Sequence, residues 1–99
     1  MEELALQTVQ AEAGDAGALE AQVAANPGDH QARFDLAVAL AGAGSREKAV
    51  EHLMAILRAD RDWSEGAART KLVSFFDAWG SKDPATIAGR RKMSSLLFS

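Results

Sequence analysis

The sequence of 99 residues contains no cysteine, two prolines and few β-branched residues. The absence of cysteine excludes disulfides, thiolate nucleophiles, iron–sulfur clusters and cysteine-ligated zinc. Val, Ile and Thr together fill ten positions, whereas alanine alone fills 21, and this balance favours helix over strand. No apolar run approaches the roughly 20 residues that a membrane span requires, and the acidic start is untypical of a signal or transit peptide. We therefore expect one soluble, cytoplasmic, all-α domain over residues 1–99.

Basic side chains are absent from the first 32 residues. Residues 1–52 carry nine acidic and three basic side chains, and residues 53–99 carry five and eight. The net charge of −3 disfavours non-specific binding to nucleic acid. Arg90, Arg91 and Lys92 form the densest basic run. They either form a solvated face that complements the end of a helix or a patch for an acidic partner protein.

Apolar residues recur with helical spacing through most of the chain. The pattern predicts six helices, at about 2–13, 16–25, 30–43, 46–60, 63–79 and 84–98. No segment alternates with period two over a useful length, so we expect no strand. Because the connections are short, consecutive helices are expected to pack as antiparallel hairpins. In the last helix, the candidate core contacts are Ile87, Met93, Leu96, Leu97 and Phe98.

Capping residues mark the ends of these predicted helices. Asp29, Ser45 and Asp83 each precede a helix as candidate N-caps, and Pro84 follows Asp83 at the first helical position. The segment from Asp62 to Glu65 has the spacing of a capping box, which predicts that the fifth helix begins there.

The helices at 30–43 and 46–60 match the tetratricopeptide repeat, a helical hairpin with a period of about 34 residues. Large and small residues occupy its packing positions, namely Leu36, Ala37, Leu40, Gly44, Ala49 and Leu53. Ala37 and Ala49 are small where the two helices would cross. We therefore expect stacked antiparallel hairpins in a tetratricopeptide-like right-handed superhelix of about six helices, with the last two helices as a capping hairpin.

Three segments resemble a known family. Residues Pro27–Ala37 (PGDHQARFDLA), Asp60–Trp63 (DRDW) and Gly66–Arg69 (GAAR) are similar to thioredoxin-fused tetratricopeptide co-chaperones, also called chaperedoxins or YbbN-type proteins. The resemblance covers about residues 15–99. It implies that the domain holds protein clients and hands them to a chaperone. The chain has no thioredoxin-like domain, so we expect it to be the C-terminal part of a longer protein, without a redox role of its own.

In this type of repeat, the first helix of each hairpin lines a concave groove. Carrying the groove positions over places five residues on that wall, namely Gln31, Phe34, Val38, Ala41 and Gly42. Repeats that clamp a peptide carboxylate need basic and amide side chains there, whereas this chain has Phe34 and Val38. We therefore predict that the groove binds unfolded or amphipathic apolar segments. The alternative is that Phe34 and Val38 pack against a neighbouring helix.

The last helix is a second candidate surface. Its apolar residues Met93, Leu96, Leu97 and Phe98 exceed what one contact face needs. We predict that the helix docks a partner chaperone through Arg90, Arg91, Met93, Leu97 and Phe98. The alternative is that the apolar residues close the core. Trp63 and Trp79 are interpreted as core or staple residues.

No constellation for catalysis is present. His30 and His52 lie on different predicted helices without nearby carboxylate clusters, so we expect no metal, no cofactor and no catalytic residues. The leading hypothesis is therefore a non-catalytic module that binds protein clients or a chaperone. The alternative is a structural spacer or oligomerisation unit that associates weakly with itself and has no ligand.

Overall fold

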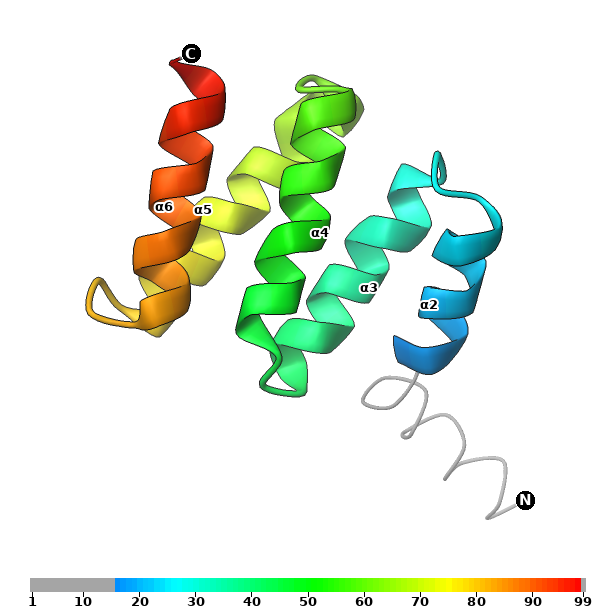
Figure 1. Ribbon diagram of the computed structural model, residues 1–99, viewed down its shortest axis with the longest axis horizontal. Coiled ribbons are helices and arrows are strands. Elements are labelled where there is room, and N and C mark those ends of the chain that lie inside the picture. The colour runs from blue at the N-terminus through cyan, green and yellow to red at the C-terminus, as the bar shows by residue number, and fades with distance from the viewer. Residues whose placement is uncertain (1–15, 99) are drawn as a thin grey trace.

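The computed structural model describes residues 16–98, and the helix expected at about 2–13 lies outside them. The described part is helical and contains no strand, as predicted. Its elements are α2 (Ala16–Ala25), α3 (His30–Gly42), α4 (Arg46–Ala59), the 3₁₀ helix η1 (Trp63–Gly66), α5 (Ala67–Trp79) and α6 (Pro84–Leu97). Consecutive helices reverse direction and stack side by side along the molecule (Figure 1). The predicted all-α architecture of stacked hairpins is confirmed.

The fifth helix begins later than predicted. Ser64 and Glu65 have φ angles of 49° and 59°, and Gly66 has a φ of 81°. Left-handed backbone cannot continue into a right-handed helix, so the chain forms η1 and turns before α5 starts at Ala67. The Asp62 side chain makes no capping hydrogen bond. The predicted capping box is therefore wrong.

Two of the three predicted N-caps are formed. Asp29 accepts a hydrogen bond from the backbone N–H of Ala32 at 3.1 Å, and Asp83 accepts one from the backbone N–H of Ala85 at 2.8 Å. The Ser45 side chain makes no such bond to α4. Asp29 and Asp83 therefore satisfy backbone donors that a helix start leaves open.

The core lies between α3, α4 and α5, and it contains the predicted repeat positions except Gly44, which is exposed. Ala37 and Ala49 are fully buried, and their small side chains let α3 and α4 approach closely. Around them pack Leu36, Leu53, Met54, Ile56, Leu57, Leu72 and Phe76. Small residues at the helix crossing and large residues beside it are what close packing requires.

Helix α6 closes the end of the stack with a face that was predicted in part, since Met93 and Leu96 were expected to contact the core. Ala85, Thr86 and Gly89 are its buried residues, and Met93 and Leu96 pack partly against the core. Positions 85, 89, 93 and 96 follow the helical repeat, whereas Ile87 lies about 200° from position 85. Ile87 is 47% exposed and Phe98, beyond the last helical turn, is 84% exposed. The predicted core contacts of Ile87 and Phe98 are therefore wrong.

Helices α4 and α6 run in the same direction, side by side (Figure 1). Two ion pairs join them. Arg46 in the first turn of α4 pairs with Asp83 just before α6, and Lys92 of α6 pairs with Glu51 of α4. The two helices therefore form one outer face of the molecule.

Candidate protein-binding surfaces

A continuous series of ring and cation contacts crosses η1, α3 and α5. Phe34 of α3 lies 5.6 Å from Trp63 of η1 between ring centres. Lys71 of α5 places its Nζ 5.9 Å from the ring centre of Phe34 and 5.9 Å from that of Phe75. Phe75 stacks on Trp79 at 5.0 Å. We call these five residues the aromatic row.

Each end of the aromatic row is held by a further contact. At one end, the His30 ring meets Trp63 edge-on, with ring centres 6.0 Å apart. At the other end, the Arg46 guanidinium lies 5.3 Å from the Trp79 ring centre. Ring pairs and cation–ring pairs of this kind each contribute about 0.5–1.5 kcal/mol. The row is therefore a surface built from three elements, η1, α3 and α5, and supported by Arg46 of α4.

Of the predicted α3 residues, Phe34 belongs to the aromatic row. Positions 31, 34, 38 and 41 share one side of α3 because they follow the helical repeat. Phe34 is half-buried against Trp63, so it does pack on a neighbouring element, as the alternative held. Val38, one turn further on, is 41% exposed. Gln31 is exposed and donates a hydrogen bond to Asp35 at 3.0 Å, and Ala41 is half-buried.

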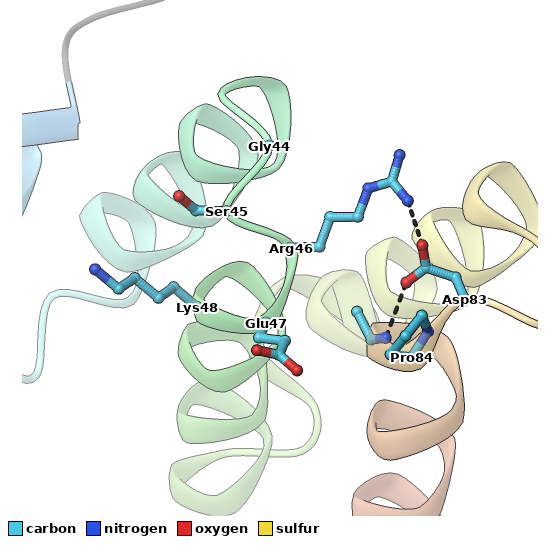
Figure 2. A pocket seen from close by; sticks show the side chains of 8 residues that line it. Gly44, Ser45, Arg46, Glu47, Lys48, Asp83 and Pro84 are labelled. Carbon is cyan, nitrogen blue, oxygen red and sulfur yellow. Dashed lines mark hydrogen bonds and ion pairs between the residues drawn. The ribbon is translucent and has the colours of Figure 1, made fainter.

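A cavity of about 400 Å³ opens where the row reaches the starts of α4 and α6. Figure 2 shows Arg46 extending across this opening to the Asp83 carboxylate, which also accepts from the α6 backbone. Arg46 thus contacts Trp79 and Asp83 together. Charged side chains line this cavity, namely Arg46, Glu47, Lys48 and Asp83, whereas the aromatic rings of the site lie on η1, α3 and α5.

The predicted α6 residues do not share one surface. The Arg90 guanidinium lies 6.0 Å from the Phe76 ring centre, on the α5 side of the helix. Arg91 and Lys92 line a cavity with Arg58 on the α4 side. Met93 and Leu97 are half-buried, and Phe98 is exposed. Three consecutive basic residues therefore point around the helix, as its geometry requires.

Among the titratable groups of residues 16–98, His52 of α4 has a pKa that is clearly displaced from its usual value. Burial of the imidazole, and then the positive charge of Arg33, lower the pKa of His52 below its usual value. Arg33 bonds to the Nδ1 atom of His52 at 3.2 Å and donates to the Pro27 carbonyl at 3.3 Å. Since a guanidinium only donates, Nδ1 accepts and His52 is neutral in this arrangement. The contact ties the loop before α3 to α4.

Residues 16–98 contain no group of three or more His, Asp and Glu side chains arranged to hold a metal. None of the helices in this part of the chain combines the length and the apolar composition of a membrane-spanning helix.

Sequence reasoning missed Lys71 and Arg46 as parts of the site, and it interpreted Trp79 as a core or staple residue. Lys71, Phe75 and Trp79 are spaced by four residues, so they lie along one strip of α5. That spacing could have found the strip. The position of this strip beside Phe34 depends on how α3 and α5 pack, and the local sequence pattern does not predict that packing.

Comparison with known proteins agrees with this architecture. A family model described as tetratricopeptide repeat matches residues 9–98. An uncharacterized protein of Haemophilus influenzae is 34% identical over 96 residues, which cover 97% of this chain and 44% of the relative. The chain thus spans less than half the length of that relative. No solved structure matches significantly. The stacked hairpins and the family match together show that the chain belongs to the tetratricopeptide-repeat family, whose members generally mediate protein–protein interactions.

Proposed function

We propose that this chain is a non-catalytic interaction domain that holds unfolded or partly folded protein clients on the aromatic row. The observation that carries the proposal is the row itself, in which three elements bring aromatic rings and Lys71 into one surface. Val38, which is 41% exposed one turn along α3 from Phe34, extends this surface. Aromatic and aliphatic surface of this kind binds apolar side chains that an unfolded segment exposes.

Lys71 gives the aromatic row a charge as well as apolar area. Its ammonium group makes no ion pair within the described residues and lies between two rings. A client segment with an acidic residue next to its apolar residues would therefore gain a charge-assisted contact. Carboxylate clamping by several basic residues is not part of this proposal, because Phe34 and Val38 occupy the neighbouring positions.

The resemblance to thioredoxin-fused co-chaperones supports a finer proposal. The domain would act in the cytoplasm beside a thioredoxin-like domain and pass clients to a partner chaperone. For that partner, the exposed end of α6 is the proposed contact. Phe98 is 84% exposed there, next to the half-buried Leu97, and an exposed aromatic side chain at the end of a helix is a suitable anchor for docking.

Suppression of aggregation tests client holding. A chemically unfolded protein is diluted into buffer with this domain, and light scattering is followed. Val38→Asp should abolish most of the suppression, because it places a charge beside the aromatic row. Val73→Asp is the matched control, since Val73 is 43% exposed on α5 and lines a different cavity with Glu65 and Arg69.

The two outcomes separate the proposal from its alternative. Loss of suppression in Val38→Asp alone, with helicity unchanged by circular dichroism, supports client binding at the aromatic row. Equal suppression by both variants and the original chain refutes binding at the row. No suppression by the original chain at any concentration favours the structural spacer without a ligand.

Docking of the partner chaperone needs a test of its own. Truncation after Lys92 would remove Met93 and Leu96, which pack against the core, so a loss of binding would be ambiguous. Phe98→Asp avoids this problem because the side chain is exposed. Binding of a purified chaperone should fall in Phe98→Asp and persist in Ile87→Asp, a second exposed position on α6. Unchanged binding by Phe98→Asp rejects this contact.

A further inference from the structure

The C-terminal halves of α4 and α6 line an open cavity of about 490 Å³ on the outer face of the molecule. Its lining is basic with one apolar residue, and we call it the basic cleft. The cleft is lined by Arg58, Arg91, Lys92, Ser95 and Leu96. The proposed client surface lies on η1, α3 and α5, and the proposed chaperone contact, Phe98, does not line this cavity. The basic cleft is therefore a separate site, and its argument does not rest on the proposed function.

The positive charges of the basic cleft are mostly uncompensated. Arg58 and Arg91 form no ion pair and no hydrogen bond within the described residues, whereas Lys92 pairs with Glu51. Arg61, in the turn after α4, donates to the backbone carbonyl of Leu96 at 3.0 Å. This bond brings a further guanidinium to the end of α6 without a carboxylate partner.

Helix dipoles explain only part of this arrangement. Arg58 lies in the last turn of α4, where a cation complements the helix end. Arg91 lies six residues before the end of α6 (Pro84–Leu97), outside the range of that effect. Packing of α4 beside α6 brings together cations that are 33 residues apart in the sequence. Their mutual repulsion is relieved when an anion binds between them.

We propose that the basic cleft binds an acidic peptide segment of a partner protein. Two carboxylates of that segment would meet Arg58 and Arg91, and an apolar side chain would lie against Leu96. Guanidinium groups favour carboxylates because two N–H donors can meet two oxygens. A nucleic acid fits less well, because its evenly charged backbone would continue into the adjoining cavity that Glu47 and Glu51 line, whereas a short peptide can place its two carboxylates at Arg58 and Arg91 alone.

Fluorescence polarisation tests this proposal on the whole chain. The probe is a fluorescein-labelled peptide of repeated Glu-Glu-Leu units. The control peptide has glutamine in place of every glutamate. The acidic peptide should bind, and the glutamine peptide should bind at least about tenfold more weakly. Raising the salt from about 50 to 300 mM should weaken binding of the acidic peptide, because exposed charges are screened.

Charge variants locate the contact. Arg58→Glu and Arg91→Glu should each weaken binding of the acidic peptide about tenfold, because each variant removes an attraction and adds a repulsion. Arg69→Glu is the matched control, an exposed arginine on α5 that lines a different cavity. Arg91→Gln, which should weaken binding by a smaller factor, keeps the test valid if a reversed charge impairs folding.

Several results would overturn the proposal. Unchanged affinity in both Arg58→Glu and Arg91→Glu would place the peptide elsewhere. Tighter binding of a single-stranded RNA oligonucleotide than of the acidic peptide would make the cleft a phosphate site. A sedimentation mass that rises with concentration, and stays monomeric in Arg91→Glu, would show that a second copy of this chain occupies the cleft.

Discussion

Gly89 of α6 lies directly against the ring of Phe76 of α5. A Cβ atom at position 89 would be 2.6 Å from Cε1 and 2.6 Å from Cζ of Phe76, and 3.2 Å from a methyl carbon of Val50. Atoms do not approach this closely without displacement, so α6 reaches its position because residue 89 has no side chain. This approach also places Arg91 and Lys92 beside α4, where they line the basic cleft.

Replacement of Gly89 by alanine should therefore destabilise the domain. The added methyl group must displace the Phe76 ring, and overpacking of this kind costs about 1–3 kcal/mol. Gly42→Ala is the control, because Gly42 is also helical and a Cβ there meets no atom within 4 Å. It should be stabilising by up to about 1 kcal/mol. Denaturant unfolding measures both, and equal stabilities of the two variants would contradict the packing described.

The two helix starts that differ in capping should respond differently to alanine. Asp83 caps α6 and pairs with Arg46, so Asp83→Ala should lower the free energy of unfolding by about 1–2 kcal/mol. The Ser45 side chain makes no capping bond, so Ser45→Ala should change it by less than about 0.5 kcal/mol. A large loss in Ser45→Ala would show that Ser45 caps α4 in solution.

Protonation of His52 should weaken the domain in mildly acidic solution. Burial and Arg33 lower the pKa of His52 in the folded state, whereas the unfolded chain has a pKa of about 6.5. The unfolded state therefore binds more protons between these two values. The contribution of neutral His52 to the free energy of unfolding should be fully present above the unfolded pKa. It should fall as pH drops through about 6.5 and level off below the folded pKa.

Replacement of His52 by glutamine tests this linkage, because glutamine offers an acceptor to Arg33 and does not titrate. The free energy of unfolding of the original chain, minus that of His52→Gln, should decrease as pH falls from about 8 to 5. A difference that stays constant across this range would show that His52 is not held neutral by the fold.

The helical elements were predictable from local signals. Periodicity, Asp29 and the Asp83-Pro84 pair located α3 and α6, because caps and apolar spacing act within a few residues. The start of α5 was not predictable in this way. The Asp62–Glu65 spacing has the form of a capping box, but left-handed backbone at Ser64 and Glu65 replaces the first helical turn. Contact of Trp63 with His30 and Phe34 accompanies this turn.

The candidate surfaces were predictable only in part. Phe34 and Val38 could be placed on one face of α3 because four residues separate them. Lys71 joins Phe34 only through the packing of α5 against the rest of the stack. In the same way, Arg58 and Arg91 belong to one cleft because α4 and α6 lie side by side. Contacts between distant segments carry no local sequence signal, so both surfaces needed the structure.

The indole N–H signals of Trp63 and Trp79 provide the most direct test of client binding on the aromatic row. The two rings lie at opposite ends of the row, and because the chain has two tryptophans, two indole proton–nitrogen correlations are expected. Titration of the isotope-labelled domain with a reduced, carboxymethylated polypeptide should shift both signals in a saturable manner. The backbone signals of Val38 and Lys71 should shift with them, and Val38→Asp should remove the response. Saturable binding that leaves both indole signals unmoved would contradict the account.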